Sequence, residues 1–231
     1  MGSPTTPAPD DPQHRPPADD PRLDLVAGSV ELRHGRLEFV RPREATALLY
    51  EEDVAADQAY PPYWAEVWPS GVELAYAVSA REWAGASVLE LGCGLGLPAV
   101  AAALGGGEVL ATDRSPDALA FAAVNAERNG VAIGTAVCSW AEPAPVTEAA
   151  PWRLVLAADV LYGQRNIAEL LALLPRLVDD GGEVWIADPQ RPLAGEFLAA
   201  ARRDWDTVTT AATRDDGVRL HRLAAPRTNL R

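Results

Sequence analysis

Short apolar runs alternate with longer amphipathic segments between positions 87 and 203. Apolar runs bounded by turn residues are typical of strands buried on both faces. The predicted strands are Ser87–Leu91, Glu108–Thr112, Thr135–Ser139, Leu154–Ala158 and Glu183–Asp188. The segments between and after them predict helices over Gly96–Leu104, Pro116–Asn129, Asn166–Val178 and Leu193–Arg203. Strands alternating with helices imply an α/β fold with a doubly wound, mostly parallel sheet.

Two segments instead alternate polar and apolar residues about a tight turn. Val30 to Val40 alternates around His34-Gly35, which predicts an N-terminal hairpin. Trp205–Ala212 and Val218–Ala224 alternate around Asp215-Asp216-Gly217, which predicts a terminal antiparallel hairpin. This second hairpin adds two strands to the five above, so we expect a sheet of seven strands.

The N-terminal segment has a different composition. Seven prolines fall within the first 21 residues, with several aspartates and almost no apolar residues. Such a segment cannot bury enough surface to offset its ordering entropy, so we expect residues 1–22 to be a disordered arm. We expect residues 23–231 to form one domain, in which residues 23–59 supply the hairpin and a weakly helical connector over Ala45–Asp57. An aromatic loop from Tyr60 to Gly71 then leads into a helix that begins at Ser70 or Gly71 and ends near Trp83.

The turn after the first of the five strands carries Gly92, Gly94 and Gly96 in a G-x-G-x-G spacing. A glycine turn between a strand and a helix lets the backbone approach a ligand that any Cβ would exclude. Asp113 ends the next strand, where a carboxylate can accept both hydroxyls of a ribose. Glu90 precedes the turn, and an acid there repels a pyrophosphate but suits a ligand with an ammonium group. These residues predict a nucleoside pocket at the carboxyl edge of the sheet, with a plain packing turn as the alternative.

This motif resembles the first motif of the class I S-adenosylmethionine (SAM)-dependent methyltransferases, E/D-x-G-x-G-x-G with an acid closing the second strand. The dinucleotide fingerprint, G-x-G-x-x-G, has a different spacing. The resemblance implies a Rossmann-like seven-stranded methyltransferase fold and SAM as the cofactor. The cofactor-binding residues that it implies here are Glu90, Gly92, Cys93, Gly94, Gly96 and Asp113.

Asp159-Val160-Leu161-Tyr162 follows the fourth strand of the core. Residues at strand ends face the crevice where α/β proteins bind ligands. For an amine that attacks a methyl group, Asp159 can orient the N–H bonds and balance the developing positive charge. Tyr162 can present its ring to a methylammonium, an interaction of roughly 0.5–2 kcal/mol. The alternative is an aspartate that caps the next turn and a tyrosine packed within it.

The wider pattern resembles one branch of the superfamily, the nicotinamide N-methyltransferase-like or methyltransferase family 16 enzymes, which include seven-strand protein lysine methyltransferases. The resemblance rests on the aromatic run from Trp64 to Gly71, Trp140 after the third strand, and the D-x-x-Y segment. It implies that Trp68 and Trp140 line the SAM pocket, with Trp140 beside the adenine, and that Ala158 faces the cofactor. Trp64 lies four residues before Trp68, so core packing can account for one of the two.

Two further segments qualify the resemblance. The residue before the third-strand tryptophan is often acidic in this branch, whereas here it is Ser139, which can bond the adenine amino group more weakly. Asp188-Pro189-Gln190-Arg191-Pro192 looks like the D-P-x-R-P segment of the electron-transfer flavoprotein lysine methyltransferases of this branch. Arg191 can meet an acidic group of a substrate, or it can be a surface arginine in a proline-limited loop.

Composition limits the partners. The formal net charge is −13, which disfavours a nucleic-acid partner and suits lysine-rich protein segments. All 20 basic residues are arginine, so a P-loop lysine or a Schiff base is excluded. The two cysteines make neither a disulfide framework nor a zinc set, and we expect no metal site. With no signal peptide and no membrane-spanning run, we expect a cytoplasmic monomer.

These observations together predict a SAM-dependent N-methyltransferase with Asp159 and Tyr162 as its catalytic residues. The expected acceptor is a lysine ε-amine of a protein. Two alternatives remain at this point: a small-molecule N- or O-methyltransferase, and a SAM-binding protein without turnover.

Overall fold

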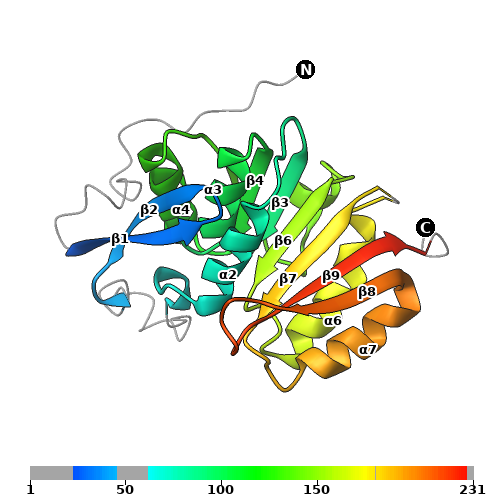
Figure 1. The fold of residues 1–231 in the computed structure, drawn as a ribbon. Coiled ribbons are helices and arrows are strands. Elements are labelled where there is room, and N and C mark those ends of the chain that lie inside the picture. The colour runs from blue at the N-terminus through cyan, green and yellow to red at the C-terminus, as the bar shows by residue number, and fades with distance from the viewer. Residues whose placement is uncertain (1–22, 46–61, 180, 228–231) are drawn as a thin grey trace.

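The computed structural model describes residues 23–45, 62–179 and 181–227. These residues form a seven-stranded sheet in the order β5-β4-β3-β6-β7-β9-β8 and a separate two-stranded sheet (Figure 1). The strands of the larger sheet are β3 (Ser87–Leu91), β4 (Glu108–Asp113), β5 (Gly134–Val137), β6 (Leu154–Ala158), β7 (Glu183–Asp188), β8 (Trp205–Ala212) and β9 (Arg219–Pro226). The first five are parallel, whereas β9 runs antiparallel to both β7 and β8. The predicted seven-stranded, mostly parallel sheet with a terminal antiparallel hairpin is confirmed.

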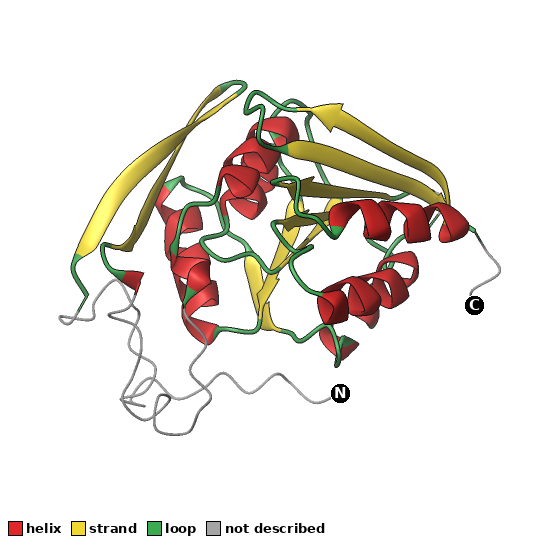
Figure 2. Ribbon diagram, turned by 90° about the horizontal axis from the view of Figure 1, so that it is seen from below, coloured by secondary structure: helices red, strands yellow, loops and turns green. Residues whose placement is uncertain are grey.

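Helices cover both faces of this sheet (Figure 2). The helices are α2 (Pro69–Val78), α3 (Leu97–Leu104), α4 (Pro116–Arg128), α5 (Ala144–Thr147), α6 (Gln164–Leu173) and α7 (Ala194–Asp204). Buried residues of α2, α3 and α4 share one core cluster with Val88 and Leu156 of the strands. Buried residues of α5, α6 and α7 share the other with Leu89 and Val155. The strand side chains thus alternate between the two faces, as the pleat requires.

Local sequence signals explain where α3 and α4 begin. Gly96 adopts a left-handed conformation, with φ of 77°, and stands just before α3. At α4 the Ser115 hydroxyl accepts a hydrogen bond from the Ala118 N–H, and Pro116 occupies the first helical position. The sequence placed both helix starts within one residue of where they lie.

The N-terminal hairpin forms the smaller sheet, β1 (Leu25–Leu32) and β2 (Gly35–Pro42), and is longer at both ends than predicted. Figure 2 shows it beside the helices rather than on the main sheet. Two asparagines four residues apart, one in α4 and one at its C-cap, pair with the backbone of β2, which would otherwise be an open edge. Asn129 accepts from the Glu38 N–H and donates to its carbonyl, while Asn125 accepts from the Val40 N–H at 2.8 Å.

Asn125 also reaches the glycine turn. Its side chain is fully buried, and its Nδ2 donates to the Leu95 carbonyl at 3.0 Å. The same amide thus joins the hairpin to the turn between β3 and α3. No sequence pattern pointed to this residue.

Three predicted boundaries are wrong for identifiable reasons. α2 ends at Val78 rather than near Trp83, because the Ser79 hydroxyl and the Trp83 indole bond the carbonyls of its last turn. The third helix of the core ends at Leu173 and passes into a 3-10 turn, η4 (Leu174–Arg176), where Pro175 cannot continue the helical hydrogen bonds. β5 stops at Val137 because the chain turns at Ser139, which bridges to Glu142.

Some predictions fall outside the described residues, namely the arm over residues 1–22, the connector after Ala45, and the start of the aromatic loop. The described part of that loop contains a short 3-10 helix, η3 (Tyr63–Ala65), and α5 was likewise not predicted. No helix formed by the described residues has both the length and the hydropathy needed to cross a membrane.

Replacing Asn125, whose side-chain amide is fully buried, should destabilise the fold strongly. Asn125→Ala leaves the Val40 N–H and the Leu95 carbonyl without their partner, at a cost of about 1–3 kcal/mol for each buried group. Urea denaturation should therefore show a loss of about 2 kcal/mol or more. Asn129→Ala is the matched control, because its two bonds to Glu38 are exposed and water can replace them, and it should cost about 1 kcal/mol or less. Equal losses in the two variants would contradict this account.

Candidate functional site

The turn that follows β3 is built from left-handed backbone. Gly92, Gly94 and Gly96 have φ of 66°, 51° and 77°, a region that side chains disfavour. The Cys93 N–H donates to the Thr112 carbonyl at 2.9 Å, which fastens the turn to β4. The turn therefore begins at the carboxyl edge of the sheet and ends at α3.

Two of these glycines are also required by protein packing. A Cβ on Gly94 would lie 3.0 Å from the Trp64 carbonyl oxygen, and one on Gly96 would lie 2.7 Å from the Ala122 Cβ. A Cβ on Gly92 would make only ordinary contacts, 3.5 Å from Cζ2 of Trp140. Protein packing therefore accounts for Gly94 and Gly96 without a ligand, as the packing-turn alternative expects, whereas packing does not require a glycine at position 92.

Glu90 does not point openly into a pocket. Its side chain is 1% exposed, and Oε2 accepts the Ala99 N–H at the start of α3, at 2.8 Å. Burial raises the pKa of this carboxyl well above its usual range, against the opposing effect of the Ala99 bond. Oε2 thus satisfies one of the N–H groups at the start of α3 that have no partner within the helix.

Asp113 braces the turn from the end of β4. Its Oδ2 accepts the Gly94 N–H and its Oδ1 accepts the Ser115 N–H, each at 3.0 Å. Burial raises the pKa of this carboxyl, while these backbone bonds act in the opposite direction. A carboxylate oxygen can accept a second hydrogen bond, so these contacts leave acceptor capacity for a ribose hydroxyl.

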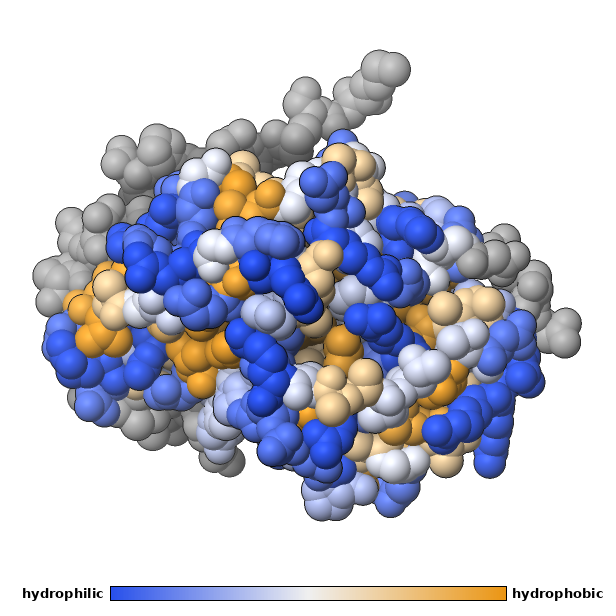
Figure 3. All heavy atoms as spheres, in the orientation of Figure 1, coloured by the Kyte–Doolittle hydropathy of each residue, from blue (hydrophilic) through white to orange (hydrophobic). Residues whose placement is uncertain are grey.

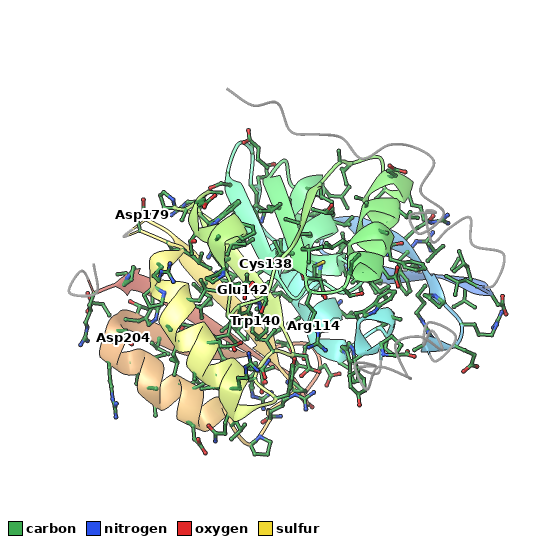
Figure 4. The ribbon with its side chains drawn as sticks, turned by 180° about the vertical axis from the view of Figure 1, so that it is seen from behind. Arg114, Cys138, Trp140, Glu142, Asp179 and Asp204 are labelled. Atoms are coloured by element: carbon green, nitrogen blue, oxygen red, sulfur yellow. The ribbon has the colours of Figure 1, made fainter. Side chains whose placement is uncertain are left out.

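Trp140 follows β5 and lies half-buried across from Gly92. Figure 4 shows Cys138, Trp140 and Glu142 together in this segment and Arg114 at the same end of the sheet, with Asp179 and Asp204 farther away. Ser139 is exposed, and its hydroxyl accepts the Ala141 N–H at 3.3 Å. A groove of about 360 Å³ runs between this segment and α6. Of the predicted cofactor residues, only Trp140 lines that groove, so we do not identify it with the cofactor site.

The aromatic loop contributes one partly buried indole, Trp64, and one exposed indole, Trp68. Trp64 packs on Phe121 of α4, with ring centroids 5.5 Å apart. Trp68 is 39% exposed, and its indole N–H donates to the Tyr63 carbonyl at 2.8 Å. Core packing therefore accounts for Trp64, and Trp68 is the indole that remains accessible.

The end of β6 carries Asp159 and Tyr162. Asp159 has a left-handed backbone, with φ of 57°, and its N–H donates to the Ala187 carbonyl of β7 at 2.9 Å. Its carboxylate forms an ion pair with Arg191 of the loop after β7. Tyr162 is 57% exposed, and its ring centroid lies 5.9 Å from the Arg191 guanidinium carbon.

The strand register brings these residues to one edge. Leu91 pairs with Thr112, Asp113 with Val137, and Ala158 with Ala187, so the glycine turn, Asp113 and Asp159 follow the ends of adjacent strands. Ala158 packs against the core cluster that α2, α3 and α4 form on one face of the sheet, and Glu90 lies on the same face of the sheet. Cys93 is buried in the same cluster, and burial raises the pKa of its thiol.

The sequence from residue 51 to residue 203 matches the model of a family described as lysine methyltransferase. The chain belongs to the lysine methyltransferase family. The branch predicted from the aromatic run and the D-x-x-Y segment is therefore confirmed.

Two relatives of this chain carry names that describe the methylation of protein lysines. It is 36% identical over 135 residues to the electron transfer flavoprotein beta subunit lysine methyltransferase of Xenopus laevis, covering 56% of this chain and 53% of that one. It is 32% identical over 120 residues to protein N-lysine methyltransferase METTL21A of Danio rerio, covering 49% and 55%. The chain spans about half the length of the curated relatives it matches.

A solved structure supports the fold. The T. thermophilus 16S rRNA methyltransferase RsmC, determined with AdoMet and guanosine, superposes with a TM-score of 0.64 and 15% identity, covering 88% of this chain and 51% of that one. At this identity the likeness concerns the fold alone. It confirms a Rossmann-like, seven-stranded methyltransferase fold.

The buried acid Glu90 should make the stability of this protein depend on pH. Because the pKa of Glu90 is raised in the folded state, that state holds more protons than the unfolded one, and stability falls as pH rises between the two pKa values. Glu90→Gln removes this loss, so the Tm of the variant relative to wild type should increase from pH 5 to pH 8. Calorimetric scans resolve the effect, since 1 kcal/mol shifts Tm by roughly 2–4 °C at this size.

Glu108→Gln, at the exposed start of β4, is the control and should keep a constant Tm difference. A constant difference for Glu90→Gln as well would show that burial does not govern this carboxyl.

Proposed function

We propose that this protein transfers methyl groups from SAM to nitrogen, and that the acceptor is a lysine ε-amine of a protein. The observation that carries the proposal is the meeting, at one edge of the sheet, of the braced glycine turn and the Asp159–Tyr162 pair. Family membership and the names of the relatives support it.

The start of α3 supports a cofactor without phosphate. In dinucleotide-binding folds the pyrophosphate sits at the N-terminus of this helix. Here the carboxylate of Glu90 occupies that position, bonded to the Ala99 N–H. With Asp113 also nearby, the turn is acidic, which suits a nucleoside that carries ammonium and sulfonium groups. The residues present therefore fit SAM.

We infer that Gly92, Cys93, Gly94 and Gly96 present the turn to the cofactor, and that Asp113 accepts the ribose hydroxyls. Trp68 and Trp140 are the proposed aromatic walls, and Ala158 and Glu90 the proposed contacts near the methyl donor. When bound, SAM supplies an electrophilic methyl carbon. Asp159 then orients the N–H bonds of the acceptor amine and balances the charge that develops, while Tyr162 offers its ring face.

We further propose a protein partner and a cytoplasmic, monomeric state. The net charge of −13 suits a lysine-rich segment and disfavours a nucleic acid. The face drawn in Figure 3 is mainly hydrophilic, and its apolar residues form small separate groups. This face therefore offers no large apolar patch for a membrane or a second copy of the chain.

The cofactor proposal predicts micromolar binding. Titration calorimetry should show SAM and S-adenosylhomocysteine binding at about −8 kcal/mol, which corresponds to a micromolar Kd. Asp113→Ala should weaken both by roughly 1.5–3 kcal/mol for each charge-assisted hydrogen bond lost. The control is Asp206→Ala, which removes an exposed carboxylate of β8 that pairs with Arg227, and it should leave both affinities unchanged. Tight NAD binding in the absence of SAM binding would contradict the proposal.

The acceptor proposal predicts one labelled protein. Tritiated SAM and the purified protein, added to extract of cells that lack it, should label a protein band on size fractionation. Asp159→Asn should bind SAM within about tenfold of wild type but lower the labelling rate by about 10² or more.

Label on small molecules alone would favour a small-molecule acceptor. An absence of label despite SAM binding would favour a protein without turnover. Unchanged labelling by Asp159→Asn would remove that carboxylate from the mechanism.

A further inference from the structure

The guanidinium of Arg191 already contacts Asp159 and Tyr162, the two residues proposed to bind the acceptor amine. Nε of Arg191 bonds Oδ1 of Asp159, and its guanidinium carbon lies 5.9 Å from the ring centroid of Tyr162. Arg191 is 32 residues from Asp159 in the sequence and comes from the loop after the neighbouring strand. The D-x-x-Y segment and the D-P-Q-R-P segment therefore form one cluster.

The backbone of Arg191 is held from two sides. Its N–H donates to Oδ1 of Asp188 at 2.8 Å, and the Asp188 side chain is fully buried. The preceding residue, Gln190, has a left-handed φ of 60° and donates from Nε2 to the carbonyls of Asp216 and Gly217 in the β8–β9 turn. This anchoring argues that Arg191 is a fixed part of the site and not a surface side chain that happens to fall there.

Arg191 bonds only one of the two oxygens of the Asp159 carboxylate. Oδ1 is bonded to Arg191, whereas Oδ2 accepts no hydrogen bond from the described residues. The Asp159 side chain is only 10% exposed, so the bond to Arg191 restrains the carboxylate in a confined space. An acceptor amine needs one oxygen for an N–H bond, and Oδ2 meets that need without displacing the arginine.

We propose that Arg191 is a positioning residue for methyl transfer, which rests on the function proposed above. It holds the Asp159 carboxylate by one oxygen, so that the other stays directed at the acceptor nitrogen. Arg191 itself does not touch the reacting atoms and acts through Asp159.

The test compares four proteins with the same probe, tritiated SAM added to extract of cells lacking the protein. They are wild type, Arg191→Gln, Asp159→Asn and the double variant. Arg191→Gln should lower the labelling rate at saturating SAM by about 10- to 100-fold, because misplacing a catalytic group is costly. It should leave the Kd for SAM within about twofold. In the Asp159→Asn background, Arg191→Gln should cost nothing further, since the group through which it acts is already lost.

The conservative Arg191→Lys should restore most of the rate. The contact to Asp159 is a single Nε bond, and a lysine Nζ falls close to the position of the arginine Cζ. Arg81→Gln is the matched control. Arg81 also pairs with a carboxylate, Glu183 at 3.0 Å, and lies 4.9 Å from the Trp185 ring centroid, but at the opposite end of β7. It should leave the labelling rate unchanged.

Three results would overturn the proposal while leaving the proposed function intact, provided that wild type binds SAM and labels an acceptor. The first is a full or increased rate for Arg191→Gln, which would mean that the arginine competes with the acceptor. The second is an equal loss from Arg191→Gln in both backgrounds, and the third is a failure of Arg191→Lys to recover activity while it remains folded. If wild type neither binds SAM nor labels an acceptor, it is the proposed function that fails.

Discussion

The turn between β3 and α3 has no room for a side chain at Gly94 or Gly96, and several elements of the fold meet there. Its left-handed glycines bring the Trp64 backbone and the Ala122 Cβ so close that a methyl group would clash. Asp113 bonds the turn from β4, and Asn125 bonds it from α4. Because helix, strand and aromatic loop all converge on the same few backbone atoms, small errors there would displace the whole site.

The acidic side chains at this turn disfavour the binding of a phosphate group. The N-terminus of α3 attracts anions, but Glu90 of the protein itself is the anion it meets. Burying this acid raises its pKa, so the site carries an electrostatic cost that plain core packing would not need. Such a cost is typical of functional sites, and it suits a ligand of opposite sign.

Much of the fold could be predicted because local signals agreed with the final contacts. β3, β6 and β7 lie at their predicted bounds, since each is a compact apolar run between turn residues. The end of α2 could not be predicted, because the apolar pattern continues to Trp83 while side-chain bonds to helix carbonyls stop the helix earlier. Strand order alone brought Asp113 and Asp159 to one edge. The partners of Glu90, Asp159 and Asn125 depend on tertiary placement, which no spacing encodes.

The amide pairing between α4 and the N-terminal hairpin has an evolutionary consequence. The side chains of Asn125 and Asn129 hydrogen-bond backbone groups at the free edge of β2. These bonds satisfy polar groups of the hairpin and of the asparagines at the same time. Loss of the hairpin would leave the bonds of Asn129 to Glu38 unmade, whereas Asn125 would still bond the Leu95 carbonyl of the glycine turn. Position 129 is therefore free to change with the hairpin, while position 125 stays tied to the turn.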